Sequence, residues 1–198
     1  MWNTNTYWTF SNALDEKTCN KIIDIGNNAE WGGGEVETNS KFEVDEAVRK
    51  SGVVFTNEQW LYDIIWPYME KANFNSGWRY NIKYAESMQI TKYEKGEFYN
   101  FHRDGKSDHL SSYNRPDNGF LHGNNRKLSM TVLLNDDYEG GDFQFAQYSK
   151  EKCNVISVEQ NKIGSIIVFP SYMEHRIIPI TKGLRYSLVV WFVGPPFV

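Results

Sequence analysis

Two stretches near the front of the chain carry apolar residues at the spacing of an α-helix. In residues 14–29 the apolar positions recur every three or four residues, and acidic residues occupy the predicted first turn. In residues 57–72 apolar pairs recur at four-residue spacing, and Thr56 or Asn57 is expected to cap the start of the helix. Pro67 is expected to kink or end this second helix.

From residue 78 onward the hydrophobic pattern has a period of two, which is typical of strands. In residues 78–84 aromatic and aliphatic side chains alternate with polar ones. Further strands are predicted at 87–93, 98–103, 127–135, 142–148, 153–158, 164–170, 174–180 and 185–193. Many short strands without strand–helix–strand alternation predict a mainly β fold of the sandwich, barrel or jelly-roll type.

Two long segments are predicted to be connections. Residues 31–50 are rich in glycine and charge and are expected to form a mobile loop, and the polar segment 105–126 is expected to be a lid or binding loop. A length of 198 residues suits a single domain, 1–198. We expect a helical N-terminal extension in 1–77, packed against a strand-rich core in 78–193.

Charge and hydropathy narrow the partners and the location. The chain has 21 Lys and Arg against 25 Asp and Glu, a net charge of −4, so neither nucleic acid nor a membrane surface is expected as a partner. No apolar run approaches the length of a membrane span, and no signal peptide is visible, so a cytoplasmic location is expected. Cys19 and Cys153 are expected to be free thiols. The sequence leaves the oligomeric state open.

Three residues have side chains and spacing that suit a metal site. His102 and Asp104 are two residues apart, and on a strand such positions face the same side. A third ligand must come from a neighbouring strand, and His175 is the candidate. Two imidazoles and one carboxylate leave adjacent coordination positions open, which suits non-haem Fe(II).

Arg185 and Ser187 form a second candidate site. Their spacing places both on one face of the strand predicted at 185–193. A guanidinium together with a hydroxyl is a good receptor for a carboxylate. The alternative is an arginine at a strand start that pairs with a surface acid. The other two histidines, His109 and His122, lie in the polar connector and are interpreted as exposed loop residues or as contacts to a substrate.

The motifs together resemble a known enzyme family. They are spread over about 87–193 and consist of Tyr93-x2-Gly96-x2-Tyr99-x2-His102-x-Asp104, Asn135 with Tyr138-Glu139-Gly140-Gly141, Phe169-Pro170, His175, Gly183-x-Arg185-Tyr186 and Trp191. This combination closely resembles the Fe(II)/2-oxoglutarate dioxygenases, and within them the prolyl 4-hydroxylase-like branch. The resemblance implies a double-stranded β-helix, a distorted jelly roll, with N-terminal buttressing helices and a catalytic core in 78–193.

The resemblance also assigns roles to individual residues. By the family pattern His102, Asp104 and His175 match the iron ligands, and Arg185 matches the residue that pairs with the far carboxylate of 2-oxoglutarate. Tyr93 matches a tyrosine that lines the same pocket, and Ser187 matches a secondary carboxylate contact. The pattern departs from the oxygen-sensing enzymes at Leu133, where those have tyrosine, and Thr131 is the candidate to replace that hydrogen bond.

The cofactors and the reaction follow from the same resemblance. It implies Fe(II), the cosubstrate 2-oxoglutarate, O₂, and ascorbate as a further cofactor to test. The implied reaction is hydroxylation of a prolyl residue in a peptide or protein, with succinate and CO₂ as coproducts, because Asp104 is present as a ligand. The alternatives are a hydroxylase of a free amino acid or other small molecule, and a catalytically silent metal-binding jelly-roll module.

Overall fold

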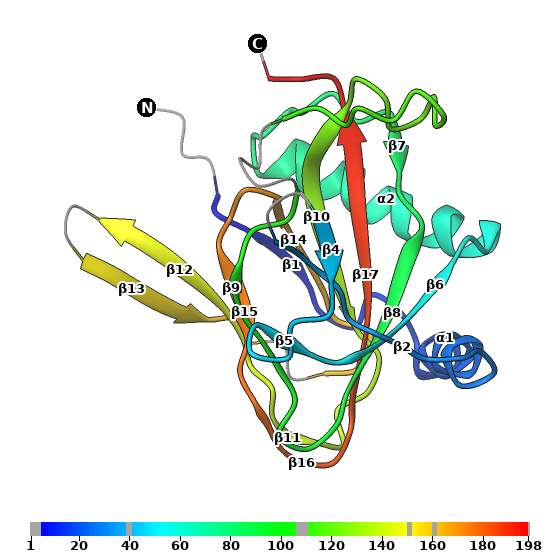
Figure 1. Cartoon of the computed structure of the whole chain (residues 1–198), viewed down its shortest axis with the longest axis vertical. Coiled ribbons are helices and arrows are strands. Elements are labelled where there is room, and N and C mark those ends of the chain that lie inside the picture. The colour runs from blue at the N-terminus through cyan, green and yellow to red at the C-terminus, as the bar shows by residue number, and fades with distance from the viewer. Residues whose placement is uncertain (1–4, 39–40, 106–110, 150–151, 160–161, 198) are drawn as a thin grey trace.

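Two antiparallel β-sheets face each other across an aromatic core and form a jelly roll (Figure 1). The computed structural model describes residues 5–38, 41–105, 111–149, 152–159 and 162–197. The core between the sheets takes Phe169 from the larger sheet, and Phe143 and Phe145 from the smaller one. The ring centroids of Phe145 and Phe169 are 5.1 Å apart in an edge-to-face arrangement, a favourable geometry for buried aromatic pairs.

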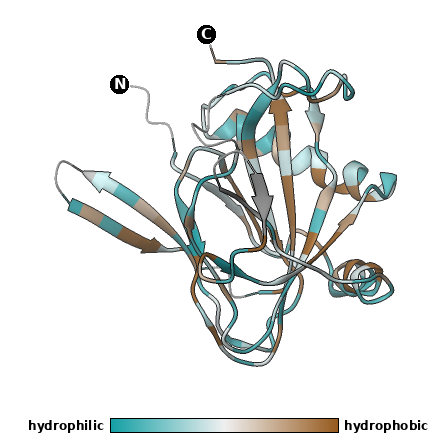
Figure 2. Ribbon diagram, viewed as in Figure 1, coloured by the Kyte–Doolittle hydropathy of each residue, from teal (hydrophilic) through white to brown (hydrophobic). Residues whose placement is uncertain are grey.

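The larger sheet has the strand order β1-β14-β10-β17-β8-β6-β2, and β7 pairs with β17. Its strands are β1 (Trp8–Phe10), β2 (Gly32–Gly33), β6 (Gly52–Thr56), β7 (Tyr84–Ala85), β8 (Met88–Tyr93), β10 (Asn125–Leu133), β14 (Ile166–Pro170) and β17 (Arg185–Gly194). Strands buried on both faces are expected to be nearly continuous in hydrophobicity, and Figure 2 shows β17 as mostly hydrophobic.

The smaller sheet has the order β13-β12-β15-β9-β5. Its strands are β5 (Arg49–Lys50), β9 (Phe98–His102), β12 (Phe143–Ser149), β13 (Lys152–Ser157) and β15 (His175–Ile177). Two further strand pairs are β3 (Val36–Thr38) with β4 (Lys41–Glu43), and β11 (Glu139–Gly140) with β16 (Ile180–Lys182). The hairpin β12–β13 extends away from the body of the molecule (Figure 1).

Two helices cover the outer face of the larger sheet. Helix α1 (Glu16–Asn27) begins at Asp15, whose carboxylate accepts a hydrogen bond from the backbone N–H of Thr18, and α2 spans Gln59–Asn75. Their buried residues share one apolar core with side chains of β8, β10, β14 and β17. Among the described residues no helix is long and apolar enough to cross a membrane.

The second helix departs from its predicted boundaries. It continues through Pro67, so the expectation that it ends there is wrong. Proline removes the hydrogen bond to the carbonyl of Asp63, and both residues are exposed, so that carbonyl lies on the side of the helix that meets water. The cap is Glu58 rather than Thr56 or Asn57, without a side-chain capping bond.

The strand predicted at 78–84 is wrong except at its end, where β7 begins at Tyr84. Arg79 has a φ of 56°, which no regular strand residue adopts. The side chain of Asn73 hydrogen-bonds both the N–H and the carbonyl of Tyr80, at 2.9 and 2.8 Å. These bonds satisfy the backbone groups that a neighbouring strand would otherwise bond.

Two further predicted segments differ from expectation. The segment 31–50, predicted to be a mobile loop, contains β2, β3, β4 and β5. The strand predicted at 174–180 is divided into β15 and β16, because Pro179 between them lacks an N–H donor. Residues 1–77 contribute strands to both sheets as well as the two helices, and the division into an extension (1–77) and a core (78–193) stays a prediction.

Candidate active site

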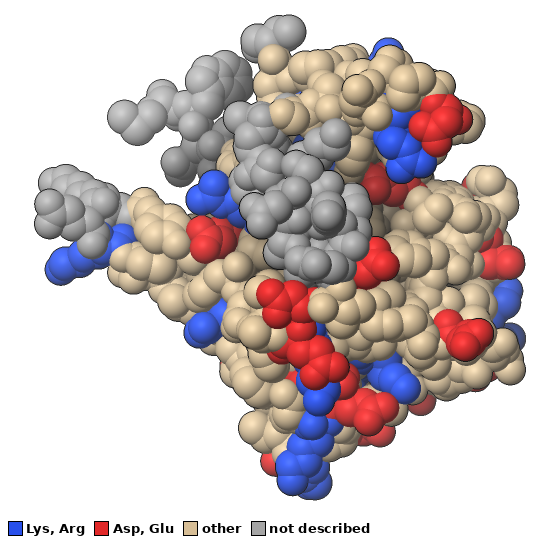
Figure 3. Space-filling model, viewed as in Figure 1, with Lys and Arg blue, Asp and Glu red and all other residues tan. Residues whose placement is uncertain are grey.

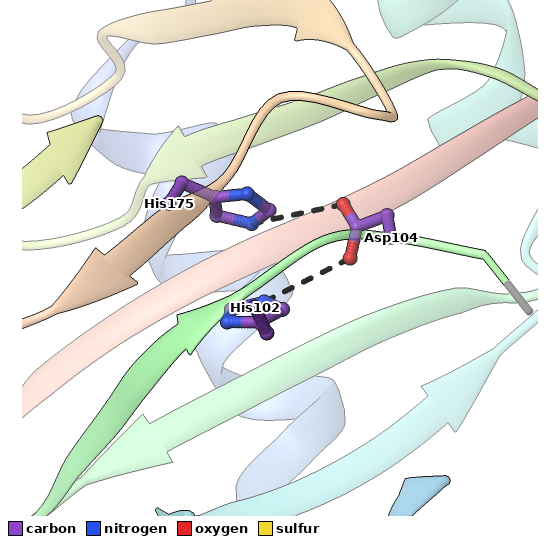
Figure 4. A group of neighbouring side chains, drawn as sticks. All are labelled: His102, Asp104 and His175. Carbon is purple, nitrogen blue, oxygen red and sulfur yellow. Dashed lines mark ion pairs between the residues drawn. The ribbon is translucent and has the colours of Figure 1, made fainter. Parts of the chain in front are cut away.

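The three predicted metal ligands lie together in the smaller sheet. His102 is the last residue of β9, Asp104 follows two residues later, and His175, the first residue of β15, pairs directly with His102. The Nε2 atoms of His102 and His175 are 3.8 and 3.7 Å from the two carboxylate oxygens of Asp104 (Figure 4). One ligand atom from each residue lies within 4.8 Å of the others.

Hydrogen bonds to the backbone orient both imidazole rings. The Nδ1 atom of His102 is 2.8 Å from the carbonyl of Asn100, and that of His175 is 2.8 Å from the carbonyl of Met173. A carbonyl only accepts, so each Nδ1 carries the proton and each Nε2 keeps a free lone pair. Burial, and then the nearby His175, lower the pKa of His102 well below its usual value, which favours the neutral ring that a metal requires.

Ser129 bonds the carboxylate of Asp104, and Ser171 supports both residues. Ser129 Oγ donates to Asp104 Oδ2 at 2.6 Å and lies 2.9 Å from Ser171 Oγ, and the backbone N–H of Asp104 donates to the Ser171 carbonyl. Burial alone would raise the pKa of Asp104, but the two histidines, Arg126 and the Ser129 hydroxyl outweigh it and lower it. The carboxylate is therefore ionised.

This donor set fits a divalent transition metal. Two imidazole nitrogens and one carboxylate oxygen, each fixed by a second hydrogen bond, match the open 2-His-1-carboxylate set of non-haem Fe(II) sites. Aromatic rings pack on both imidazoles. The Tyr99 ring stacks on His102 at a centroid distance of 3.4 Å, and Phe143 stacks on His175 at 5.3 Å. These contacts restrict ring rotation.

Arg185 lies in the same cavity as these three residues. It is the first residue of β17, is 1% exposed, and pairs directly with Tyr93 of β8. Its Nη1 donates to Ser187 Oγ at 3.2 Å, and its Nε has no hydrogen-bond partner. In the described part of the chain no acidic side chain forms an ion pair with it. A buried cation without an acid is a receptor for an anionic ligand.

The other predicted residues divide into those in the cavity and those outside it. Tyr93, Ser187 and Thr131 line the cavity, with Thr131 contributed by β10. His122 is exposed and is not among the described residues that line it, and His109 lies outside the described residues.

Sequence patterns did not indicate a second group of cavity residues. Arg126 forms a bidentate ion pair with Glu86, with N–O distances of 2.7 and 2.8 Å, and its guanidinium lies 4.0 Å from the centre of a Trp191 ring. Behind them Tyr113, which is not among the lining residues, donates to the same carboxylate at 3.1 Å. A further arginine, Arg49 of β5, also lines the cavity. These residues come from distant segments, so no motif spacing connects them.

The cavity is large and reaches the surface. Its volume is about 1940 Å³, and it extends from the metal-ligand cluster past Trp191 to Phe55, Tyr62 and Phe120. On the face seen in Figure 3 a recess separates the upper part of the molecule from the helical part on the right.

The chain is similar to known proteins over the region that contains the metal-ligand cluster. The chain matches the family described as the 2OG-Fe(II) oxygenase superfamily over residues 88–193. It is 27% identical to a PKHD-type hydroxylase from a Synechococcus species over 194 residues, which covers 90% of this chain and 74% of the relative. A PKHD-type hydroxylase of Idiomarina loihiensis is 26% identical, covering 91% and 74%.

Solved structures show the same fold. A Pseudomonas putida prolyl-4-hydroxylase superposes with a TM-score of 0.67 at 17% identity, covering 96% of this chain and 92% of the other. A viral collagen prolyl hydroxylase from Paramecium Bursaria Chlorella virus-1 superposes with a TM-score of 0.64 at 17% identity, covering 98% of both. With this fold, this ligand set and these matches, the chain belongs to the 2OG-Fe(II) oxygenase superfamily and is a 2-oxoglutarate-dependent dioxygenase that uses Fe(II) and O₂.

Proposed function

We propose that this dioxygenase hydroxylates a C–H bond of a prolyl residue in a peptide or protein, with succinate and CO₂ as coproducts. The observation that carries the proposal is one cavity that holds both the His102, Asp104 and His175 cluster and the unpaired guanidinium of Arg185. A dicarboxylate cosubstrate requires both features, since one end binds at the metal and the other needs a cationic receptor.

Each side chain then has a defined task. His102, Asp104 and His175 would hold Fe(II), which when bound couples oxidation of 2-oxoglutarate by O₂ to hydroxylation of the substrate. Arg185 binds the far carboxylate of 2-oxoglutarate through its guanidinium, and Ser187 keeps that guanidinium in place from 3.2 Å.

The walls of the pocket contribute polar groups and exclude water. Tyr93, which pairs with Arg185, and Thr131 both line it, and their hydroxyls can donate to the cosubstrate carboxylate. The rings of Phe143 and Phe169 pack against His175, at centroid distances of 5.3 and 4.7 Å, and keep water from that side of the cluster.

Two observations favour a peptide over a small molecule. The cavity volume of about 1940 Å³ exceeds the roughly 300–1,000 Å³ of small-ligand pockets, so a metabolite would leave much of it empty. A structural neighbour from Trichoplax adhaerens, with a TM-score of 0.66 at 16% identity, is a prolyl hydroxylase in complex with a peptide fragment of the hypoxia inducible factor oxygen degradation domain. The open surface recess suits an extended chain.

The test is a peptide screen with the Fe(II)-loaded protein, 2-oxoglutarate and O₂, with and without ascorbate. We expect succinate release to rise with a subset of proline-containing peptides, and mass spectrometry to find one added oxygen atom on proline. His175→Ala is expected to abolish both signals, while His122→Ala, at an exposed histidine, should keep them. Oxygen added only to other residues, or only to free amino acids, would refute the prolyl peptide assignment.

A further inference from the structure

A second buried arginine in the cavity has no acidic partner among the described residues. Arg49 is 5% exposed, lines the same cavity as the metal-ligand cluster, and pairs with Tyr99 across β5 and β9. Across the described ranges no ion pair involves it, whereas Arg126 is paired with Glu86. A buried cation without a counter-ion is costly to keep unless a ligand supplies the negative charge.

The position of this guanidinium is closely defined. Its Nε donates to Ser51 Oγ at 2.8 Å, its Nη1 approaches the carbonyl of Glu35 at 3.4 Å, and its central carbon lies 4.6 Å from the centre of the Tyr99 ring. A Cβ atom at Gly34 would collide with Arg49 and with Ser51, so glycine leaves the space that the guanidinium occupies.

The contacts leave part of the donor fork unused. A guanidinium has five N–H donors, and the recorded bonds use two of them. Tyr99 lies between Arg49 and the metal-ligand cluster, stacked on His102 at 3.4 Å. The guanidinium of Arg49 and the imidazole of His102 therefore both contact the ring of Tyr99.

The charges in the cavity indicate what Arg49 binds. In the proposed function, 2-oxoglutarate uses one carboxylate at the metal and the other at Arg185, so the cosubstrate has no carboxylate left for Arg49. Glu86 and Glu174 of the cavity wall are paired with Arg126 and Arg103, and its other acids except Asp104 are exposed. Among the buried charges that remain, those of Asp104 and of the cosubstrate fall one short of those of Fe(II) and the two arginines. The remaining positive charge favours a negative group on the substrate.

We propose that Arg49 binds a carboxylate of the substrate, and so selects substrates with an acidic group close to the hydroxylated residue. This inference rests on the proposed function. The carboxylate has two sources, namely an Asp or Glu side chain near proline in a peptide, or the α-carboxylate of a free amino acid. Arg rather than Lys suits this role, because its planar fork bonds both carboxylate oxygens.

The experiment compares matched acids and amides. Proline-containing peptides carry Glu or Gln, and Asp or Asn, at each position within three residues of the proline, and free L-proline is compared with L-prolinamide. Binding is measured by calorimetry to Zn(II)- and 2-oxoglutarate-loaded protein, and hydroxylation in the Fe(II)-loaded protein. We expect about ten- to a hundredfold tighter binding of the acid in one series, as for a charge-assisted hydrogen bond.

Two variants with the same change in net charge complete the test. Arg49→Met is expected to reduce the acid-to-amide ratio to near one, and Lys50→Met, at the exposed neighbouring residue, should leave it unchanged. A preference that persists in Arg49→Met overturns the inference, and so does equal binding of acids and amides by the wild-type protein, which does not depend on whether the variant folds. If prolyl peptides are hydroxylated without an acid preference, the inference about Arg49 is wrong and the proposed function stands. If no prolyl residue is hydroxylated, the proposed function is wrong, and the acid-to-amide binding ratios then decide the inference about Arg49.

Discussion

Replacing Arg185 by methionine should separate the affinity for 2-oxoglutarate from the stability of the fold. Methionine keeps a long, unbranched side chain in a position that is 1% exposed, and removes the charge and all five donors. The three metal ligands are not changed. The variant therefore tests the proposed role of Arg185 as the receptor for the far carboxylate.

The expected loss of affinity follows from the geometry. Truncating one partner of a buried, hydrogen-bonded charge pair costs roughly 2–5 kcal/mol, or about 30- to 4,000-fold in affinity. Arg185 is 1% exposed and lies in the same cavity as the metal ligands, so the loss from its replacement is expected to fall within this range. Arg185→Lys should be intermediate, because it keeps the charge and loses the fork.

The stability of the unliganded Arg185→Met protein should not fall, in contrast to its affinity for 2-oxoglutarate. Arg185 is buried without an acid and its Nε is unsatisfied, so removing it removes an electrostatic penalty rather than a stabilising pair. We therefore expect the melting temperature of the unliganded Arg185→Met variant to stay level or rise. Functional sites commonly show this opposition between stability and binding.

The assay is calorimetric titration of 2-oxoglutarate into Mn(II)-loaded wild type and variants, with thermal melts of the metal-free proteins. Metal affinity, measured first, should be the same in all three proteins. Unchanged cosubstrate affinity in Arg185→Met would refute the pocket. A large fall in melting temperature together with lost binding would show that Arg185 is structural, and the reasoning from its unpaired charge would then be wrong.

Three further predictions concern the support of the site and the fold. Ser129→Ala should weaken metal binding about 10- to 100-fold, measured by competition with a chelator, because it removes the hydrogen bond that orients Asp104. Gly164→Ala should lower the free energy of unfolding by at least about 2 kcal/mol in urea titrations, since residue 164 has a φ of 75° and a Cβ there would collide with a backbone carbonyl. A thiol reagent at pH 8 should modify the exposed Cys153 and spare the folded protein's Cys19, whose pKa burial raises to about 11.

Controls for these predictions come from the same chain. Ser157→Ala, on an exposed position of β13, should not change metal affinity, and Gly119→Ala, where a Cβ meets no atom within 4 Å, should not change stability. Equal losses in Ser129→Ala and Ser157→Ala would contradict the role of the serine at Asp104. In denaturant both thiols should react, and fast reaction of both in the folded protein would contradict the burial of Cys19.

Apolar runs between turn residues predicted the strands in the middle of a sheet, because burial on both faces makes such strands nearly continuous in hydrophobicity. Strand β17 (Arg185–Gly194) is the clearest case. Its first residue, Arg185, lies at the cavity, as its spacing to Ser187 indicated. The segment 78–84 alternates between apolar and polar residues, yet it lies mostly outside the sheets, since the side chain of Asn73 hydrogen-bonds the backbone groups of Tyr80. Because Asn73 lies outside this segment, the pattern of residues 78–84 does not indicate the hydrogen bonds that keep it out of the sheet.

The metal-ligand cluster could also be predicted from the sequence, because two of its three residues are close together in the chain. His102 and Asp104 are two residues apart at the end of one strand, and only His175 had to be found in a second strand. Of the serines behind Asp104, Ser129 lies on β10 and Ser171 in the turn that follows β14, and no spacing distinguishes them. Hydroxyl groups are common, so their role becomes visible only when the fold brings them to the carboxylate.

The folded structure determines which arginines remain free to bind ligands. Arg126 finds Glu86, which is 40 residues away in sequence, and both charges are then neutralised within the protein. Arg185 and Arg49 are both buried, at 1% and 5% exposure, and are left without acids among the described residues. The sequence motif around Arg185 marked that arginine, but nothing in the sequence distinguishes Arg49 from the paired Arg126. The protein can keep two uncompensated cations only because ligands neutralise them. Since 2-oxoglutarate has a single carboxylate to spare beyond the metal, the second cation favours a negative charge on the substrate, and its acid preference is the property to measure first.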